Sequence, residues 1–137
     1  MTKNILISII GVIGSAIASA FGGWTTGLTT LVIFMAIDYI TGLIVAGVFH
    51  KSTKTETGTL ESRAGFKGLC RKGAMLLVVL VAYRLDLAVG TAYIKDAVII
   101  AFMANEAISI IENAALMGVP MNDTLKNAID VLQKKKS

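Results

Sequence analysis

Ionisable side chains stand near the middle of several long apolar segments, where a charge has little water to solvate it. They are Asp38 in residues 28–49, Arg84 and Asp86 in residues 74–94, and Glu106 in residues 97–116. Inside a lipid bilayer each such group costs at least about 2.5–3.5 kcal/mol unless it is paired, protonated or hydrated. We therefore expect one polar layer at the middle of the membrane, facing either the interior of a bundle or an interface between subunits, with Arg84 as its cation and the carboxylates as partners.

A polar stripe continues this layer along the segment 97–116. Its members are Asn105, Ser109, Glu112 and Asn113, and Glu106, Ser109 and Asn113 form a neighbouring row. Residues three or four positions apart share one face of a helix, so these side chains point the same way. Such a stripe suits either a static hydrogen-bonded helix contact or the lining of a water-filled path, and the sequence leaves both interpretations open.

Residue patterns typical of enzymes are absent from the sequence. It has no glycine-rich phosphate loop, no paired histidine or cysteine metal spacing, and no nucleophile with a histidine partner. His50 is the single histidine and Cys70 the single cysteine, so an internal disulfide is excluded as well. We expect no enzymatic activity, no cofactor and no metal ion.

Composition shows which elements must carry these side chains. The chain has 137 residues, of which 55% are hydrophobic and 16% charged, and Asp38 is the only charged residue between Lys3 and Lys51. A soluble helix needs a polar face, so this composition excludes an ordinary cytosolic domain. We expect one all-α integral membrane domain over residues 1–137. Its transmembrane helices are expected at residues 5–21, 28–49, 74–94 and 97–116.

Small residues recur in the first two segments. They are Gly11, Gly14, Ser15, Ala18 and Ser19 in the first, with Gly42 and Ala46 in the second. Because lipid supplies no hydrophobic drive between helices, small residues at four-residue steps favour close helix contact, and we expect copies to associate through the first segment. Lys3 and the run 18–20 also fit a signal peptide, but the next apolar segment follows so soon that we favour a retained span.

Basic residues set the expected orientation, because cytoplasmic loops collect lysine and arginine. Residues 50–73 and the tail 119–137 are basic, which places both termini in the cytoplasm. The segment 63–72 and the tail are expected to form short amphipathic helices on the inner leaflet. Anionic lipid headgroups, rather than nucleic acid, are the expected partners of their cations. Those cations are Arg63, Lys67, Arg71, Lys72, Lys134, Lys135 and Lys136.

Three blocks in consistent order, within residues 35 to 137, resemble the phage holin family that also includes clostridial toxin-secretion holins. The first is Asp38-Tyr39-Ile40-Thr41-Gly42. The second runs from Lys51-Ser52 to Gly58 and on through Ser62, Gly65, Phe66, Lys67, Gly68 and Lys72. The third covers residues 105–113 and Met117-Gly118-Val119-Pro120. Asn122 departs from the family, which often has a second proline there, and the first segment matches no family motif.

The resemblance implies a protein that accumulates in the bacterial inner membrane and then oligomerises abruptly into lesions. Such lesions release or activate a cell-wall hydrolase (an endolysin), or release another protein cargo such as a toxin. The implied partners are further copies of the chain, the anionic membrane, an endolysin and an antiholin. Two alternatives stay open: a small proton- or ion-coupled transporter, and an antiholin that regulates a partner holin.

Overall fold

The computed structural model describes residues 2–136, with the side chains of Ile129, Leu132, Gln133 and Lys136 outside the described part. Every regular element in this range is a helix, which confirms the all-α class. The helices are α1 (Thr2–Ala20), α2 (Thr26–Gly47), α3 (Ser62–Val89), α4 (Ile94–Leu116) and α5 (Asp123–Lys136).

Local sequence signals explain where the helices begin and end. The Thr25 hydroxyl accepts a hydrogen bond from the Leu28 amide (3.2 Å) and so caps the start of α2. Gly90 ends α3 in the left-handed conformation that glycine adopts without a steric penalty. Past the end of α4, Gly118 also has a positive φ, and the Asn122 side chain accepts from the Leu125 amide (2.9 Å) at the start of α5.

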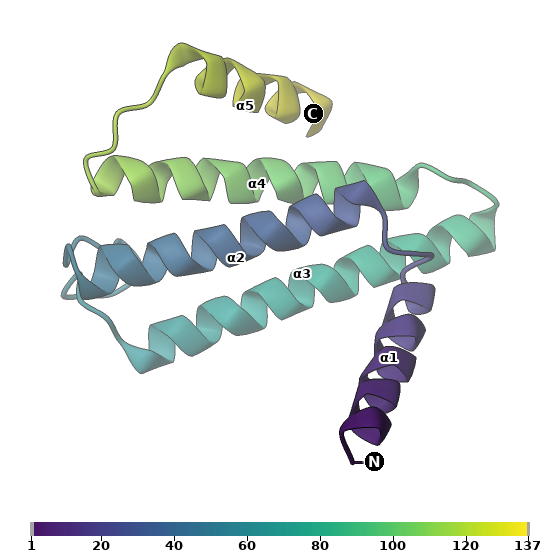
Figure 1. Ribbon diagram of the computed structural model, residues 1–137. Helices are drawn as coiled ribbons and strands as arrows, with labels where there is room; N and C mark the ends of the chain where they lie inside the picture. The colour runs from purple at the N-terminus through teal and green to yellow at the C-terminus, as the bar shows by residue number, and fades with distance from the viewer. Residues whose placement is uncertain (1, 137) are drawn as a thin grey trace.

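Three helices form the core of the molecule. As Figure 1 shows, α2 and α4 run in one direction and α3 in the other, and α4 packs against both, whereas α2 and α3 contact each other little. The core is an apolar layer in which every side chain is at least 95% buried. Its residues are Leu28, Leu31 and Met35 of α2, Val79 of α3 and Ile99 of α4. We call these five residues the apolar layer.

The first helix stands apart from this bundle. In Figure 1, α1 leaves the core at a steep angle, and within residues 2–20 no side chain is buried. Gly22 and Gly23 both have positive φ and form the turn between α1 and α2. A bundle of three helices, with α1 outside it, thus replaces the predicted four-helix bundle. By length and composition, α1 and α2 are the two described helices that could cross a membrane.

The helices differ from the expected segments at two places. The segment 63–72, expected as a separate surface helix, is the first part of α3, because Gly73 lies within the helix and no proline interrupts it. The segment expected to end at residue 94 stops at Val89, since Gly90 ends the helix and Ile94 already begins α4. The loop between α2 and α3 is therefore shorter than predicted. Helix α5 folds back along α4 (Figure 1).

Candidate functional site: a buried ion cluster

A lysine between two carboxylates joins the three core helices. The ammonium of Lys72 on α3 lies 2.6 Å from Asp38 Oδ2 on α2 and 2.7 Å from Glu106 Oε2 on α4. The side chains are 14%, 5% and 7% exposed, in that order, so water screens the charges poorly. We call these three residues the ion cluster. Its formal charge is −1, because one ammonium faces two carboxylates.

Asn113 extends the ion cluster along α4. It is buried, and its side-chain amide donates to Asp38 Oδ1 (3.1 Å), to the Asp38 carbonyl (3.2 Å) and to Thr41 Oγ1 (2.9 Å). Gly42 lies beside this amide, where an added Cβ would be in ordinary van der Waals contact, 3.8 Å from the Asn113 nitrogen. Both oxygens of Asp38 are thus held, one by a cation and one by an amide.

The structure brings together two of the four side chains that were expected in one polar layer, around a different cation. Asp38 and Glu106 do meet, but the ammonium between them belongs to Lys72, whereas Arg84 is exposed and forms no ion pair with any described residue. Asp86 lies elsewhere, at the end of α3, where it caps the next helix. Its carboxylate accepts from the Ile94 and Lys95 amides (both 2.9 Å) and from Thr91 Oγ1 (2.6 Å).

We predict that Arg84→Ala leaves both membrane accumulation and lysis timing close to those of the unaltered protein. The guanidinium is exposed and bridges no pair of described residues, so its removal leaves no buried charge unpaired. Immunoblots of membrane fractions and turbidity curves after induction measure both quantities. If Arg84→Ala reduced membrane accumulation or lysis as much as Lys72→Met does, the assignment of Lys72 as the cation would be contradicted.

A cavity of about 430 Å³ opens from the ion cluster toward the loop between α2 and α3. Its walls come from α2, α3, α4 and this loop, and include Tyr39, Leu43, Gly65, Gly68, Asn105 and Ser109. The hydroxyl of Tyr39 donates to the Gly65 carbonyl (3.2 Å) across the gap between α2 and α3. Asp38, Lys72 and Glu106 all line this cavity, so water entering it reaches the charged groups.

A second polar cluster holds the turn between α1 and α2. The ammonium of Lys95, a buried residue of α4, donates to the Phe21 carbonyl and lies 5.3 Å from the ring centroid of Tyr83. The same tyrosine ring lies against Gly22, where any Cβ would collide with it. We call Phe21, Tyr83, Asp86 and Lys95 the hinge cluster. It attaches α1 to the connection between α3 and α4.

The structure divides the remaining predicted residues into inward-facing and outward-facing groups. Of the polar stripe, Asn113 is buried and Asn105 and Ser109 line the cavity, whereas Glu112 is exposed. Ala46 is buried, but Gly11 and Gly14 have no neighbour within 4 Å of an added Cβ. Of the other small residues of α1, Ser15 and Ser19 are exposed and Ala18 is half-buried.

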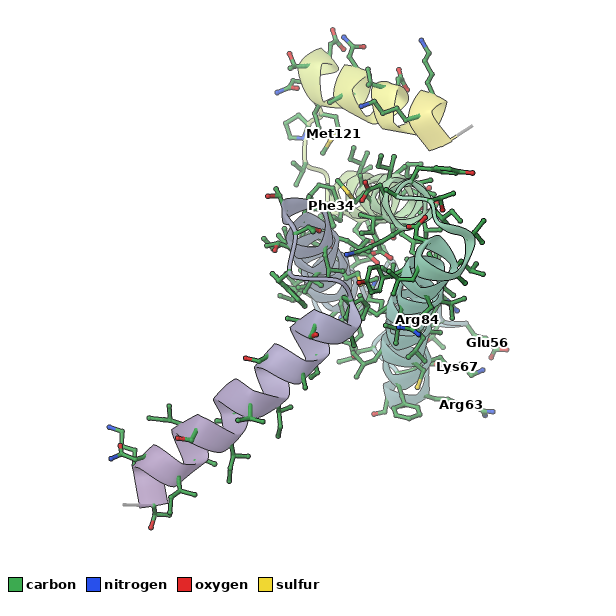
Figure 2. All side chains as sticks on the ribbon, turned by 90° about the vertical axis from the view of Figure 1, so that its right-hand side faces the viewer. Phe34, Glu56, Arg63, Lys67, Arg84 and Met121 are labelled. Atoms are coloured by element: carbon green, nitrogen blue, oxygen red, sulfur yellow. The ribbon has the colours of Figure 1, made fainter. Side chains whose placement is uncertain are left out.

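Most cations expected at lipid headgroups are exposed. They are Arg63, Lys67, Arg71, Lys134 and Lys135, and the side chain of Lys136 lies outside the described part. In Figure 2, Arg63 and Lys67 project outward from α3, and α1 extends away from the bundle. Lys72 was predicted in this group and is the exception, because its ammonium turns inward to the two carboxylates.

Sequence reasoning missed two functional candidates, Lys72 as an interior cation and Lys95 as a hinge residue. For Lys72 a signal was present: Arg63, Lys67 and Arg71 repeat every four positions, and Lys72 falls outside that stripe. One further residue turns by about 100° around a helix, which directs the side chain to another face. Lys95 offered no such signal, because Asp96 beside it cancels its charge in the sequence.

The ion cluster suits structural and proton-handling roles better than metal binding. Within the described part of the chain, no group of three histidine, cysteine or carboxylate side chains could hold a metal ion. The carboxylates face an ammonium, which takes the place that a cation would need. What the arrangement does offer is a buried charge network next to a cavity, built from three helices.

A family model and several bacterial proteins match the chain. Residues 15–134 match the model of the bacteriophage holin family. An uncharacterized Listeria innocua protein is 38% identical over 130 residues, covering 94% of this chain and 86% of its own. A 14.9 kDa Clostridium perfringens protein is 38% identical over 126 residues, covering 90% and 89%.

A phage protein is also similar to the chain. A protein of Bacillus phage phi105, named as a "Probable holin", is 31% identical over 107 residues, covering 77% of this chain and 73% of its own. No solved structure matches the chain significantly. The family match spans most of the sequence, including all three residues of the ion cluster. Two described helices of the chain, α1 and α2, are long and apolar enough to cross a bilayer. The chain is a membrane protein and belongs to the bacteriophage holin family.

Proposed function

We propose that this holin family member collects in the bacterial inner membrane and then assembles into lesions through which an endolysin acts on the cell wall. The observation that carries the proposal is the ion cluster, which keeps Asp38, Lys72 and Glu106 inside a single copy and away from lipid. A chain whose two buried carboxylates share one ammonium inside the bundle can accumulate without damage. Once copies associate, the same polar side chains are available to line water.

The position of the ion cluster supports a bundle that crosses the bilayer. Asp38 and Glu106 lie within two residues of the middle of α2 and α4, and Lys72 within four of the middle of α3. Charges at that depth need partners, and each of the three has one. Large apolar residues face outward around this level, among them Ile33, Ile40, Leu77 and Val81, which suits contact with lipid tails. By length and composition alone, only α1 and α2 of the described helices reach the criterion for a span. We infer that α3 and α4 nevertheless span the membrane beside α2, because Lys72 and Glu106 are paired inside the bundle.

Helix α1 is the element we assign to contact between copies. It is 19 residues long, within the range needed for a span of about 30 Å, and packs against no other described helix through its small residues. Gly11, Ser15 and Ser19 lie on one face, and Gly14 and Ala18 follow the same four-residue step. Such a face permits close helix contact, so α1 of one copy can pack against α1 of another. With α1 as a fourth span, both termini lie in the cytoplasm, as the basic loop and tail favour.

Controlled expression in a bacterium, with and without a cytoplasmic muralytic enzyme, tests this function. We expect growth to stop abruptly at a defined time, and turbidity to fall only when the enzyme is present. Uptake of dyes of increasing size measures the lesion, and large dyes should enter at the same moment. Cysteine crosslinking along α1, in a Cys70→Ser background, should capture dimers through the face of Gly11 and not through the opposite face.

Other outcomes identify the alternatives. Selective movement of protons or small solutes, with no passage of a large dye or of the enzyme, would contradict a holin and indicate a transporter. Delay of lysis caused by a partner holin, without lysis by this chain alone, would indicate an antiholin. Arg63→Ala serves as a matched control, because its exposed side chain lies outside the ion cluster.

A further inference from the structure

The ion cluster and the apolar layer stand in a regular relation along all three core helices. Leu31 precedes Asp38 by seven residues, Ile99 precedes Glu106 by seven, and Val79 follows Lys72 by seven. Seven residues make two helical turns, or about 10 Å. Because α3 runs opposite to α2 and α4 (Figure 1), all three steps lead toward the same end of the bundle. Leu31, Val79 and Ile99 of the apolar layer therefore lie about two turns from the ion cluster, on the side of the hinge cluster, whereas Leu28 lies farther along α2 and Met35 nearer.

Most of the cavity lies on the opposite side of the ion cluster, and only Met75 and Phe102 of its lining lie about one turn toward the apolar layer. It is lined by Tyr39, Gly42 and Ala46, which follow Asp38 on α2, and by Ala64 and Gly68, which precede Lys72 on α3. Residues of the connecting loop, including Ser52 and Thr55, complete its wall. The buried Thr55 hydroxyl has no partner among the described residues, which leaves a polar atom for a water molecule at this wall. The charges thus face a space that water can fill from the loop.

The other side is closed to water. Leu28, Leu31 and Val79 are 0% exposed and Ile99 is 2% exposed, so the three helices meet there without a polar atom from any of these side chains. Beyond this layer, polar groups return at the hinge cluster, with Asp86 seven residues after Val79 and Lys95 four before Ile99. An apolar constriction between two polar regions blocks water and ions by dewetting, as hydrophobic gates do in channels.

We propose that a single copy of this chain contains a one-sided aqueous half-channel, which conducts protons from the loop side to the ion cluster and is closed by the apolar layer. This inference rests on the membrane-spanning arrangement proposed above and adds an activity that needs no assembly of copies. If the apolar layer becomes polar, the half-channel joins the hinge cluster and the single copy leaks protons. Such a leak is far too narrow for an enzyme or a large dye.

The test uses the full chain in lipid vesicles at a low protein-to-lipid ratio, with a trapped pH indicator and an imposed pH gradient. Val79→Asn places an amide in the apolar layer, and Val78→Asn places the same amide one residue away on a side chain that is 46% exposed. We expect several-fold faster proton entry with Val79→Asn and unchanged entry with Val78→Asn. A large trapped dye should be retained in both cases. A helical, reconstituted Val79→Asn protein that leaks no faster than Val78→Asn would overturn the inference.

A labelling experiment decides the case in which Val79→Asn does not fold. Cysteines replace Ser109, on the cavity wall, or Val79, in separate Cys70→Ser proteins, and a small charged thiol reagent is applied from each side of the membrane. We expect S109C to react from the loop side alone and V79C to react from neither side. An unreactive S109C, or a V79C that reacts as fast as S109C, would overturn the inference.

The half-channel and the lesion proposal can fail separately. Lysis by the chain, with no proton leak through Val79→Asn, would disprove the half-channel alone. A proton leak through Val79→Asn, with no lysis by the chain, would disprove the lesion proposal alone.

Discussion

Replacing Lys72 with methionine is expected to destabilise the folded bundle by about 3–5 kcal/mol, the usual effect of removing one partner from a buried ion pair. Methionine keeps much of the side-chain volume, so the loss comes mainly from the charge. Asp38 and Glu106 would then face each other at 5% and 7% exposure with no ammonium between them. Thermal unfolding in detergent, followed by circular dichroism, measures the stability. Immunoblots of membrane fractions measure accumulation, and we expect both to fall and lysis to be lost.

Two variants show whether charge pairing is the cause. Lys67→Met removes an exposed cation from the same helix and should leave stability and lysis nearly unchanged. Adding Asp38→Asn and Glu106→Gln to Lys72→Met removes the unpaired carboxylates, and should recover most of the lost stability. Equal stability of the Lys72→Met and Lys67→Met proteins would show that the ion cluster does not hold the three helices together.

The helices themselves could largely be predicted from the sequence. An apolar run with few charges must be a helix in a membrane protein, because only a helix or a closed barrel satisfies the backbone there. Pro120 then marks a stop after α4, whereas the stop at Gly90 was missed, since the third segment was expected to continue to residue 94. The exception was α3: Gly73 is a weak helix breaker, and a change from basic to apolar composition indicates a change of environment rather than a helix end.

The partners inside the ion cluster could be predicted only in part. Depth along a helix is readable from the sequence, so Asp38 and Glu106 were expected in one layer, and the structure brings them together around Lys72. Rotation of each helix about its axis is set by packing, and that rotation turns Arg84 outward. Lys72 was assigned to lipid headgroups because its neighbours are basic. Its side chain instead reaches inward to the carboxylates of α2 and α4.

The three members of the ion cluster belong to three separate blocks of the family pattern. Asp38 opens the first block, Lys72 closes the second, and Glu106 and Asn113 lie in the third. In the structure these blocks meet around one cavity, so the ordered motifs of the sequence correspond to one site in space. That correspondence explains why a match of sequence blocks spread over about a hundred residues carries information about function. Helix α1 lies outside these blocks, in keeping with its place outside the bundle.

Lys95→Met should release α1 from the bundle while leaving the start of α4 intact. The substitution removes the ammonium that donates to the Phe21 carbonyl and contacts the Tyr83 ring. Leaving a buried acceptor without its donor costs about 1–3 kcal/mol, and the lost cation–π contact adds about 0.5–2 kcal/mol. The backbone amide of residue 95 still donates to Asp86, so the cap on α4 survives. We therefore expect a change in the hinge rather than loss of the fold.

Spin labels on cysteines at Val12 in α1 and Leu77 in α3, in a Cys70→Ser background, report the angle of α1 through their distance distribution. Both sites are well exposed, so the labels disturb no packed residue. Lys95→Met should broaden the distribution and change the time of lysis, because α1 is the helix proposed to join copies. As a control, Asp96→Asn alters the exposed neighbouring residue and should change neither the distance distribution nor the time of lysis. A distribution as narrow as that of the unaltered chain would mean that the glycine turn, and not the Lys95 ammonium, fixes the direction of α1.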